Sequence, residues 1–437
     1  MLYWKNTSGA KQGGDIIKFI DLFAGAGGLS EGFTRVGFKD VAHIEMNPEA
    51  ANTLKTRRAY WYLKENNSID KYYSYLSGKK TRDELYSLIP DNIMASVINC
   101  TMDDKNIKEL FKVIDKHLKS QGGESHVNLI VGGPPCQPYS LAGRARLRNK
   151  EISLKNCKSP ADDSRKYLYR IYCQFLSYYK PDMFVFENVP GLLSADNGKH
   201  WQDIQQMLRS TGYEIADKEL NARDFGVPQE RKRIIIIGWR KQSQFSFPDF
   251  KPLKADWNVA DILSDLPAIQ AGEQDDEYKE EAPHQYVKKY LRTNKDVLTW
   301  HIARPHTEQD REIYRMAIRE WCYRGQHRRL NYQNIPKHLQ THKNTTCFAD
   351  RFKVVAPDIP YCHTVLAHLS KDGHYFIHPD PKQARSLTVR EAARLQSFPD
   401  SYFFEGSRTS AFTQIGNAVP PLMAQHIAEA LRKQLQG

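Results

Sequence analysis

The chain has 437 residues, of which 40% are hydrophobic and 26% are charged, a composition typical of a globular protein with a sizeable core. A chain of this length is expected to form two or three domains. Its formal net charge of +12 indicates an acidic partner, nucleic acid before a membrane surface, although a soluble protein can also be basic without such a partner.

The cysteines and the hydropathy of the chain exclude further classes of protein. Seven cysteines are scattered without a CxxC or Cys/His spacing, so we expect neither a disulfide framework nor a zinc site. The first residues, MLYWKNTSGAKQGGD, lack the apolar core of a signal peptide, and no stretch approaches the roughly 20 apolar residues that span a bilayer. We therefore expect an intracellular protein with no metal and no membrane association.

Short apolar runs alternate with amphipathic segments from Lys18 to Trp239, which predicts a sheet wound with helices. The expected strands are Phe19–Phe23, Val41–Glu45, Val127–Val131, Asp182–Val189, one from Tyr213 and one from Arg233, and the expected helices follow Gly28 and cover about Tyr167–Tyr179 and Trp201–Leu208. The link of about Ala222–Lys232 is too short for a helical crossover, so the last two strands should be antiparallel.

This topology predicts where polar residues gather. Ligands of an open parallel sheet bind beyond the carboxyl ends of its strands, and an antiparallel strand begins at that same edge. Five residues should therefore share one rim, namely Glu45, Cys136, Glu187, Arg231 and Arg233.

Two regions depart from the alternation. An aromatic and basic insertion at about residues 55–98 interrupts the predicted sheet, and after Arg240 the sequence becomes irregular, without clear periodicity. Between Trp321 and Val355 of this second region, seven basic residues accompany a single acid. Regularity returns near the end, where Thr388 and Glu391 have the spacing of a capping box and a last helix starts with proline in its first turn.

The stretch DLFAGAGGLS follows the first strand and opens a helix, the position at which glycines let a backbone approach a nucleotide-like ligand. Ser30 occupies the third glycine position of a GxGxxG motif, so a tight turn without a ligand is an alternative. Glu45 lies twenty residues beyond Gly25, where a carboxylate can accept hydrogen bonds from both ribose hydroxyls. The pair favours a nucleotide-like cofactor.

The stretch LIVGGPPCQPYS leaves a buried strand and enters a stiff loop that carries Cys136. A lone cysteine more often packs in a core than takes part in a reaction. A loop stiffened by prolines at the end of a strand, however, fixes the side chain in place and leaves it accessible. Glu187 ends an apolar strand, where a partly desolvated carboxylate could give a proton or simply pair with an arginine. The stretch QERKRIIII could likewise be only a charged turn before a buried strand.

The ordered motifs of the chain resemble those of the DNA (cytosine-5) methyltransferases of the bacterial restriction-modification type. They are FIDLFAGAGG, GGPPCQPYS, FENVPG, QERKRIIIIG, LTVREAARLQSFPD and QIGNAVPP, and the match extends from Phe19 to about Ala424. The resemblance implies an α/β fold: a Rossmann-like S-adenosylmethionine-dependent methyltransferase sheet with an antiparallel last strand, plus a smaller, irregular target recognition domain. It places the catalytic and cofactor-binding domain at 1–241, with the insertion at about 55–98, the recognition domain at 242–383, and a returning C-terminal segment at 384–437.

The resemblance also implies a covalent mechanism on a cytosine of double-stranded DNA. Carbon 5 of cytosine is too poor a nucleophile to take a methyl group, so Cys136 would first add to carbon 6. Glu187 would share a proton with the ring nitrogen N3, and Arg233, together with Arg231, would hold the cytosine O2. The target base would have to be flipped out of the duplex.

The cofactor implied is S-adenosyl-L-methionine. Its expected contacts are Phe23, Gly25, Gly28, Glu45, Met46, Asp103, Pro135, Leu168 and Asn417. Asp104 is an alternative to Asp103 as the acid that contacts adenine, and Met46 stands where many relatives carry an aromatic residue.

Double-stranded DNA is the expected partner. The expected DNA contacts are Arg324, Arg328, Arg329, Lys343 and Arg351. Family analogy allows a companion restriction endonuclease acting on the same site, a monomeric state and a location in the bacterial cytoplasm. Methylation of transfer RNA and a catalytically silent DNA-binding relative are the alternatives, and the target sequence cannot be read from the chain.

Overall fold

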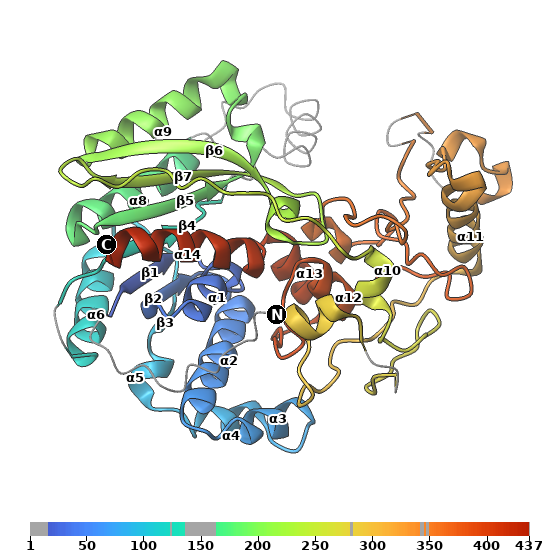
Figure 1. Ribbon diagram of the computed structural model, residues 1–437, viewed down its shortest axis with the longest axis horizontal. Coiled ribbons are helices and arrows are strands. Elements are labelled where there is room, and N and C mark those ends of the chain that lie inside the picture. The colour runs from blue at the N-terminus through green and yellow to red at the C-terminus, as the bar shows by residue number, and fades with distance from the viewer. Residues whose placement is uncertain are drawn as a thin grey trace.

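A computed structural model describes residues 16–122, 125–135, 163–279, 283–340, 345–346 and 349–436. Within these residues the centre of the molecule is a seven-stranded sheet in the order β3-β2-β1-β4-β5-β7-β6 (Figure 1). The strands are β1 (Lys18–Leu22), β2 (Lys39–Glu45), β3 (Val97–Asn99), β4 (Leu129–Gly132), β5 (Met183–Asn188), β6 (Tyr213–Asn221) and β7 (Lys232–Arg240). The α/β fold is therefore confirmed.

Strand β7 is the antiparallel member that the short link predicts. The strands β1 to β5 pair in parallel, whereas β7 runs antiparallel to both β5 and β6. The link between β6 and β7 holds only a short 3-10 helix at Ala222–Phe225. Because β7 starts where β5 ends, its first residues lie at the rim formed by the carboxyl ends of the parallel strands.

Helices cover both faces of the sheet, because alternate side chains of a strand point to opposite faces. Leu129 and Val131 pack with α1 (Gly28–Arg35) and α14 (Pro421–Gln436), whereas Ile130 packs with α6 (Ile107–Ser120), α8 (Asp163–Tyr179) and α9 (Lys199–Ser210). Figure 1 shows α14 lying along the sheet beside the N-terminal strands. The helices expected after Gly28 and over about 167–179 and 201–208 are confirmed, with boundaries that differ by a few residues.

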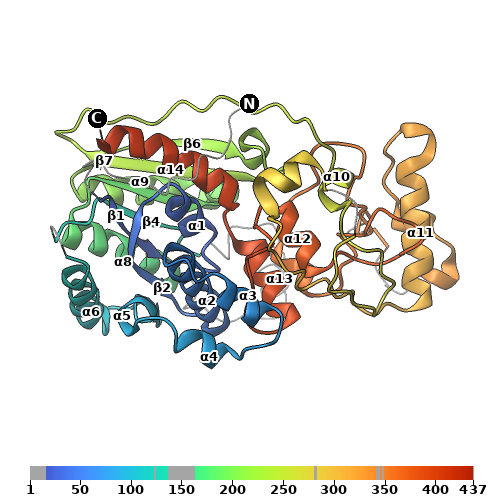
Figure 2. The same cartoon turned by 60° about the horizontal axis from the view of Figure 1, so that its bottom comes forward.

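The insertion does not interrupt the sheet, which corrects that expectation. Helix α2 (Pro48–Glu65) begins well before residue 55, and Asn47 caps its first turn. Three short helices, α3 (Asp70–Leu76), α4 (Arg82–Tyr86) and α5 (Asp91–Met94), then lead into the edge strand β3. The whole segment is an enlarged crossover between the parallel strands β2 and β3, and it lies along one edge of the molecule (Figure 2).

The region after β7 is less irregular than its sequence suggests. Its described residues form α10 (Val259–Leu263), a π-helix η4 (Val287–Leu291), α11 (Glu308–Cys322) and the 3-10 helices η5 (Tyr323–Gly325), η6 (Tyr332–Asn334), η7 (Lys337–Leu339) and η8 (Ala367–Ser370). Helix α11 lies farthest from the sheet (Figure 2), and it packs on a small core of its own formed by residues between 313 and 377. Its buried residues Ile313, Tyr314, Ala317 and Ile318 recur at helical spacing, a signal that the sequence prediction missed.

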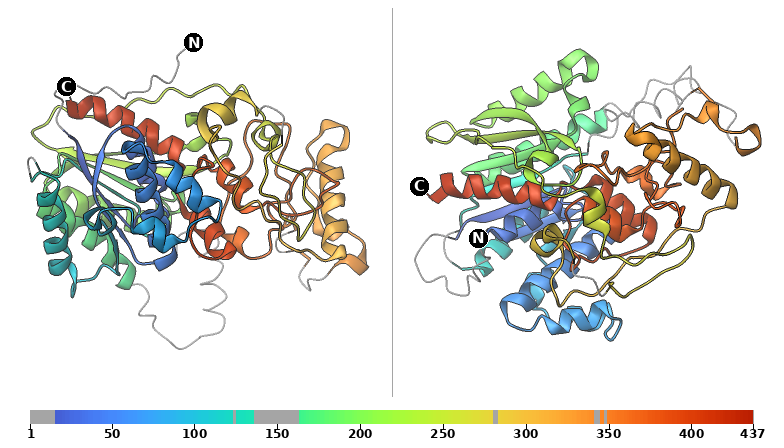
Figure 3. Two further views of the ribbon diagram at one scale, coloured as in Figure 1. Left: turned by 90° about the horizontal axis from the view of Figure 1, so that it is seen from below. Right: turned by 45° about the vertical axis from the view of Figure 1, so that its right-hand side comes forward.

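The C-terminal segment returns to the sheet, as Figure 3 shows from two further sides. Helix α12 (Val389–Leu395) has the capping box predicted at Thr388 and Glu391, α13 (Arg408–Asn417) follows, and α14 starts with proline as expected. A Cβ atom at Gly32 would lie 2.4 Å from the backbone nitrogen of Gln425, so α1 and α14 approach each other closely. Among the described residues no helix is long and apolar enough to cross a membrane.

Candidate active site

Glu187 and Arg233 meet at the rim of the sheet. Glu187 is the second-last residue of β5 and Arg233 the second of β7, and the antiparallel register brings the two strand ends together. The Arg233 Nε donates to Glu187 Oε1 at 2.7 Å, and only 13% of the Glu187 side chain is exposed. Burial lowers the pKa of Arg233, and the charge of Glu187 opposes that effect. The predicted acid and one predicted arginine therefore form a largely buried ion pair.

The loop that leaves β4 packs directly against this pair. The Asn188 Nδ2 donates to the carbonyl of Pro134 at 3.1 Å, and Asn188 is itself buried. A Cβ atom at Gly133 would lie only 2.6 Å from Glu187 Oε2, so only glycine leaves room for the carboxylate. Pro135 is exposed, and Cys136, which follows it in the sequence, lies outside the described residues.

Glu45 and the loop after β1 form a cradle next to the rim. Glu45 Oε2 accepts from the backbone nitrogen of Gly25 and Oε1 accepts from that of Asn47, both at 2.7 Å. Burial raises the pKa of Glu45 above its usual value. Phe23 and Gly25 adopt positive φ angles of 57° and 56°, and no atom lies within 4 Å of a Cβ built at Gly25. The loop therefore turns sharply and leaves open space above a backbone that is fixed by the carboxylate.

The C-terminal segment closes one side of this cradle. A Cβ atom at Gly28 would lie 2.1 Å from the carbonyl oxygen of Val419, so the turn after α13 rests on the glycine loop. Asn417, the last residue of α13, is exposed two residues before that contact. The structure thus brings Asn417 to the loop of Gly25 and Gly28, from almost four hundred residues away in the chain.

The remaining predicted cofactor residues lie around the same loops. The backbone nitrogen of Cys100 donates to the carbonyl of Glu45 at 3.2 Å, so the chain after β3 starts beside the cradle. Asp103 is half-buried and its Oδ1 accepts from the nitrogens of Lys105 and Asn106 before α6, whereas Asp104 is exposed. Met46 is 63% exposed next to Glu45. Leu168, on α8, is half-buried.

Arg231 is held by partners other than the cytosine O2 that is expected from the sequence. Its side chain is fully buried, and its guanidinium donates to the carbonyls of Val365, Gly416 and Ala418, each at 2.9 Å. A guanidinium whose terminal nitrogens are occupied by backbone carbonyls cannot also reach a base. Arg231 lies just before β7 and Arg233 is the second residue of that strand, so the two arginines are only two residues apart in the sequence and only their partners distinguish them.

The predicted DNA-contacting residues differ in exposure: some arginines are exposed, whereas one is buried. Arg324 and Arg328 are exposed, and both guanidiniums lie 5.3 Å from the ring centroid of Tyr323. Arg329 is 60% exposed in its side chain and lies 3.9 Å from Asp350. Arg351 is only 9% exposed, with its guanidinium 4.2 Å from the ring centroid of Tyr332, so it supports the small core of residues between 313 and 377, which together with α11 we call the lobe of α11. Lys343 lies outside the described residues.

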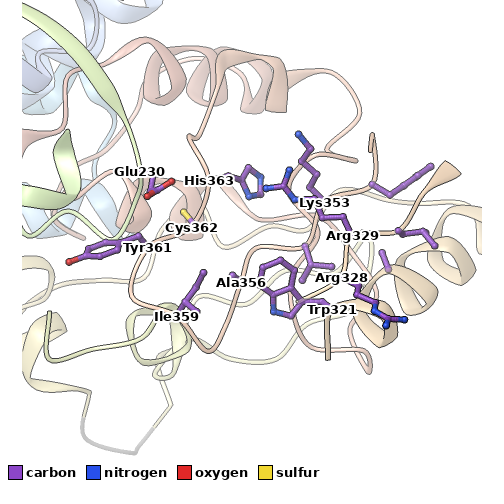
Figure 4. A pocket seen from close by; sticks show the side chains of 14 residues that line it. Glu230, Trp321, Arg328, Arg329, Lys353, Ala356, Ile359, Tyr361, Cys362 and His363 are labelled. Atoms are coloured by element: carbon purple, nitrogen blue, oxygen red, sulfur yellow. The ribbon is translucent and has the colours of Figure 1, made fainter. Parts of the chain in front are cut away.

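A groove connects these basic residues to the start of the last strand. It has a cavity volume of about 250 Å³ and extends from Trp321, Arg328 and Arg329 to Glu230 (Figure 4). Tyr361 lies at the Glu230 end, and Cys362 and His363 lie between the two ends. Glu230 immediately precedes Arg231 within the string QERKR, and the sequence prediction did not assign it to a surface. The groove therefore joins the lobe of α11 to the segment that carries Arg233.

Comparison with protein families matches residues 17–80 and 100–433 to the family described as "C-5 cytosine-specific DNA methylase". Among curated proteins, "Type II methyltransferase M.Bpa9945I" of Bacillus paralicheniformis is 40% identical, with 96% of this chain and 99% of the relative covered. "Type II methyltransferase M1.HphI" of Haemophilus parahaemolyticus is 30% identical, with 95% and 87% covered.

Solved structures share the fold. A putative DNA modification methyltransferase encoded within an Escherichia coli prophage aligns with a TM-score of 0.60 and 23% identity, with 96% of this chain and all of that chain covered. The Entamoeba histolytica methyltransferase EhMeth aligns with a TM-score of 0.52 and 15% identity, with 97% and 100% covered. At these identities the likeness concerns the architecture.

Proposed function

Since the chain belongs to the family of C-5 cytosine-specific DNA methylases and is a DNA cytosine-5 methyltransferase, we propose that it acts through a covalent adduct between Cys136 and carbon 6 of a flipped-out cytosine. The observation that carries the proposal is the convergence at one rim of the Glu187–Arg233 pair, the Pro134–Pro135 loop that precedes Cys136, and the Glu45 cradle. The ends of the four strands β1, β2, β4 and β5 and the start of β7 supply these parts.

The chain's own residues divide the work at the base. The Cys136 thiolate adds to carbon 6, which places electron density on the ring and makes carbon 5 nucleophilic. Glu187 shares a proton with N3 as that charge develops, and Arg233, fixed by its bond to Glu187, offers its remaining N–H groups to O2. After carbon 5 has been methylated, loss of its proton restores the double bond and expels the Cys136 thiolate.

The cradle of Glu45 has the properties that S-adenosyl-L-methionine requires. A carboxylate whose oxygens each accept one backbone N–H retains lone pairs for two ribose hydroxyls. The space above Gly25 lets a ligand approach the backbone, and the exposed Met46 side chain is available to cover an adenine ring. When bound, this cofactor supplies an electrophilic methyl group on a sulfonium. Phe23, Gly28, Pro135, Leu168, Asn417 and one of Asp103 and Asp104 complete its proposed contacts.

The lobe of α11 is the proposed surface for double-stranded DNA. It belongs to the segment 242–383, which is proposed to be the target recognition domain. Arg328 and Arg329 line the groove with exposed side chains, and the exposed guanidinium of Arg324 lies 5.3 Å from the same Tyr323 ring as that of Arg328. Such cations attract phosphates in a strongly salt-dependent way, without specifying a sequence. Lys343 belongs to the same basic stretch of sequence and is proposed with them.

The relatives named type II methyltransferases suggest a biological setting. We propose that the protein is the modification enzyme of a bacterial restriction-modification system, acting as a monomer in the cytoplasm. A companion endonuclease for the same site would be its functional partner.

The test is methyl transfer from labelled S-adenosyl-L-methionine to unmethylated duplex DNA, with transfer RNA as a parallel substrate. Cys136→Ser should abolish transfer to DNA while DNA binding persists, and Cys173→Ser, which changes a half-buried cysteine on α8, should leave transfer unchanged. Duplex DNA containing 5-fluorocytosine should trap a covalent complex, because fluorine cannot leave as a proton does. Transfer to RNA alone, or undiminished transfer by Cys136→Ser, would overturn the proposal.

A further inference from the structure

The buried guanidinium of Arg231 has an unusual set of partners. Its three hydrogen bonds at 2.9 Å all go to backbone carbonyls, those of Val365, Gly416 and Ala418. No carboxylate is among its hydrogen-bond partners in the described part of the chain, and burial together with the nearby charge of Arg233 lowers its pKa. Burying a charge is costly unless hydrogen bonds compensate it, so these three carbonyls fix the place of the side chain.

Two buried glutamines extend the same hydrogen-bond network. Gln229 donates to the carbonyl of Leu395 at 3.0 Å and to Gln396 Oε1 at 2.5 Å, and its Oε1 accepts from the backbone nitrogen of Val365 at 2.7 Å. Gln396 in turn donates to the carbonyls of Ile415 and Ala418 at 3.0 and 2.9 Å. Both glutamine side chains are thereby fully engaged between segments that are distant in sequence.

The network joins three segments that the proposed reaction uses. The first, Gln229–Arg233, carries Arg233, which pairs with Glu187. The second, Cys362–Val365, includes Cys362 and His363, which line the groove together with Glu230. The backbone nitrogen of Glu230 donates to the carbonyl of Cys362, and the nitrogen of Cys362 donates to the carbonyl of Pro228, just before the first segment. The third, Ile415–Ala418, contains Asn417 and leads to the contact between Val419 and Gly28.

We propose that Arg231, together with Gln229 and Gln396, is a positioning residue that fixes the DNA-binding groove and the cofactor-binding turn to the catalytic rim. Its guanidinium bonds to the groove segment through Nη1 and to the Asn417 turn through Nη2, so one side chain sets the distance between the two. This inference rests on the proposed function, because it assigns DNA to the groove and S-adenosyl-L-methionine to the turn.

The proposal makes a different kinetic prediction from either alternative. A catalytic arginine stabilises the transition state, so its loss lowers kcat. Loss of a residue that only stabilises the fold lowers the melting temperature. Its two KM values then change no more than those of a control variant with the same loss of melting temperature. A positioning residue that holds both binding surfaces raises the KM values for DNA and cofactor together, because each surface then pays an ordering cost on binding.

The experiment compares Arg231→Met and Gln396→Met with Gln383→Met, which removes a buried glutamine whose hydrogen-bond partners are Ile269, Asp380 and Arg385. Steady-state methylation would use a duplex containing the site mapped by bisulfite sequencing. We expect both Arg231→Met and Gln396→Met to raise the two KM values about fivefold or more, with kcat changed less than about twofold. Arg231→Lys should restore little, because one ammonium cannot span three carbonyls.

Three outcomes would overturn the inference: a large fall in kcat with unchanged KM values, a rise in only one KM, or the same rise in Gln383→Met at an equal loss of melting temperature. Hydrogen exchange without substrates gives a readout that is independent of activity. Peptides covering 361–366 and 415–419 should exchange faster together in Arg231→Met or Gln396→Met but not in the control. If the wild-type protein failed to methylate DNA, that exchange result would still decide whether the network couples the two segments.

Discussion

Gly133→Ala is the sharpest test of the geometry at the rim. The added Cβ would lie 2.6 Å from Glu187 Oε2, and ordinary contact begins at 3.4 Å, so the carboxylate must move by about 0.8 Å. That movement is large enough to break or redirect the 2.7 Å bond between Glu187 and Arg233. A misplacement of about 1 Å can cost about 100-fold in rate, equivalent to about 2.7 kcal/mol of transition-state stabilisation.

The assay is single-turnover methyl transfer at saturating DNA and cofactor, combined with thermal unfolding. We expect Gly133→Ala to lose about 100-fold in rate while its melting temperature changes little, because the obstructing atom belongs to a side chain that can rotate. Gly132→Ala is the matched contrast. Its Cβ would lie 2.4 Å from the backbone carbonyl of Leu22 in the neighbouring strand β1, which cannot move aside, so unfolding should become easier by about 1–3 kcal/mol.

Two results would refute this reasoning. Wild-type rates for Gly133→Ala would mean that the position of the Glu187 carboxylate beside the loop does not matter for the reaction. An equal loss of stability in both variants would mean that the space at Gly133 is structural and unrelated to the carboxylate.

Three further predictions concern the cofactor, the DNA and the insertion. Glu45→Gln should raise the Kd for S-adenosyl-L-methionine about tenfold or more by calorimetry, because an amide cannot accept at both positions. In the wild-type protein the affinity should fall as pH is lowered through the raised pKa of Glu45, because the protonated carboxyl accepts less well; a pH-independent Kd would contradict this. Arg328→Gln should reduce the slope of log affinity against log salt for DNA by about 1, whereas Arg351→Gln should lower the melting temperature and leave the slope unchanged. Tyr73→Phe should cost about 1–2 kcal/mol of unfolding free energy with kcat unchanged, because Asp296 loses its 2.7 Å bond to the insertion; a changed kcat would show that the insertion acts on the reaction.

Periodicity accounts for the parts of the fold that the sequence predicted well. The runs that became β1, β4, β5 and β7 are apolar because both faces of the sheet are covered, and the short link before β7 permits no crossover. Strand β3 was missed because it has only three residues, too few for a pattern to appear. Helix α11 was missed because charged residues surround its narrow apolar face.

Residue order determined the family and the rim, because four of the six motifs end or begin a strand and parallel strands share one carboxyl edge. Only the tertiary structure decided which partners each of these residues contacts. Arg231 and Arg233 stand two apart in one string, yet one donates to three buried carbonyls and the other to Glu187, because Arg231 lies in the link before β7 whereas Arg233 belongs to the strand and is held beside the end of β5. The turn after Asn417 meets the glycine loop at Gly28, and α14 packs on α1, contacts between the two ends of the chain that no local pattern encodes.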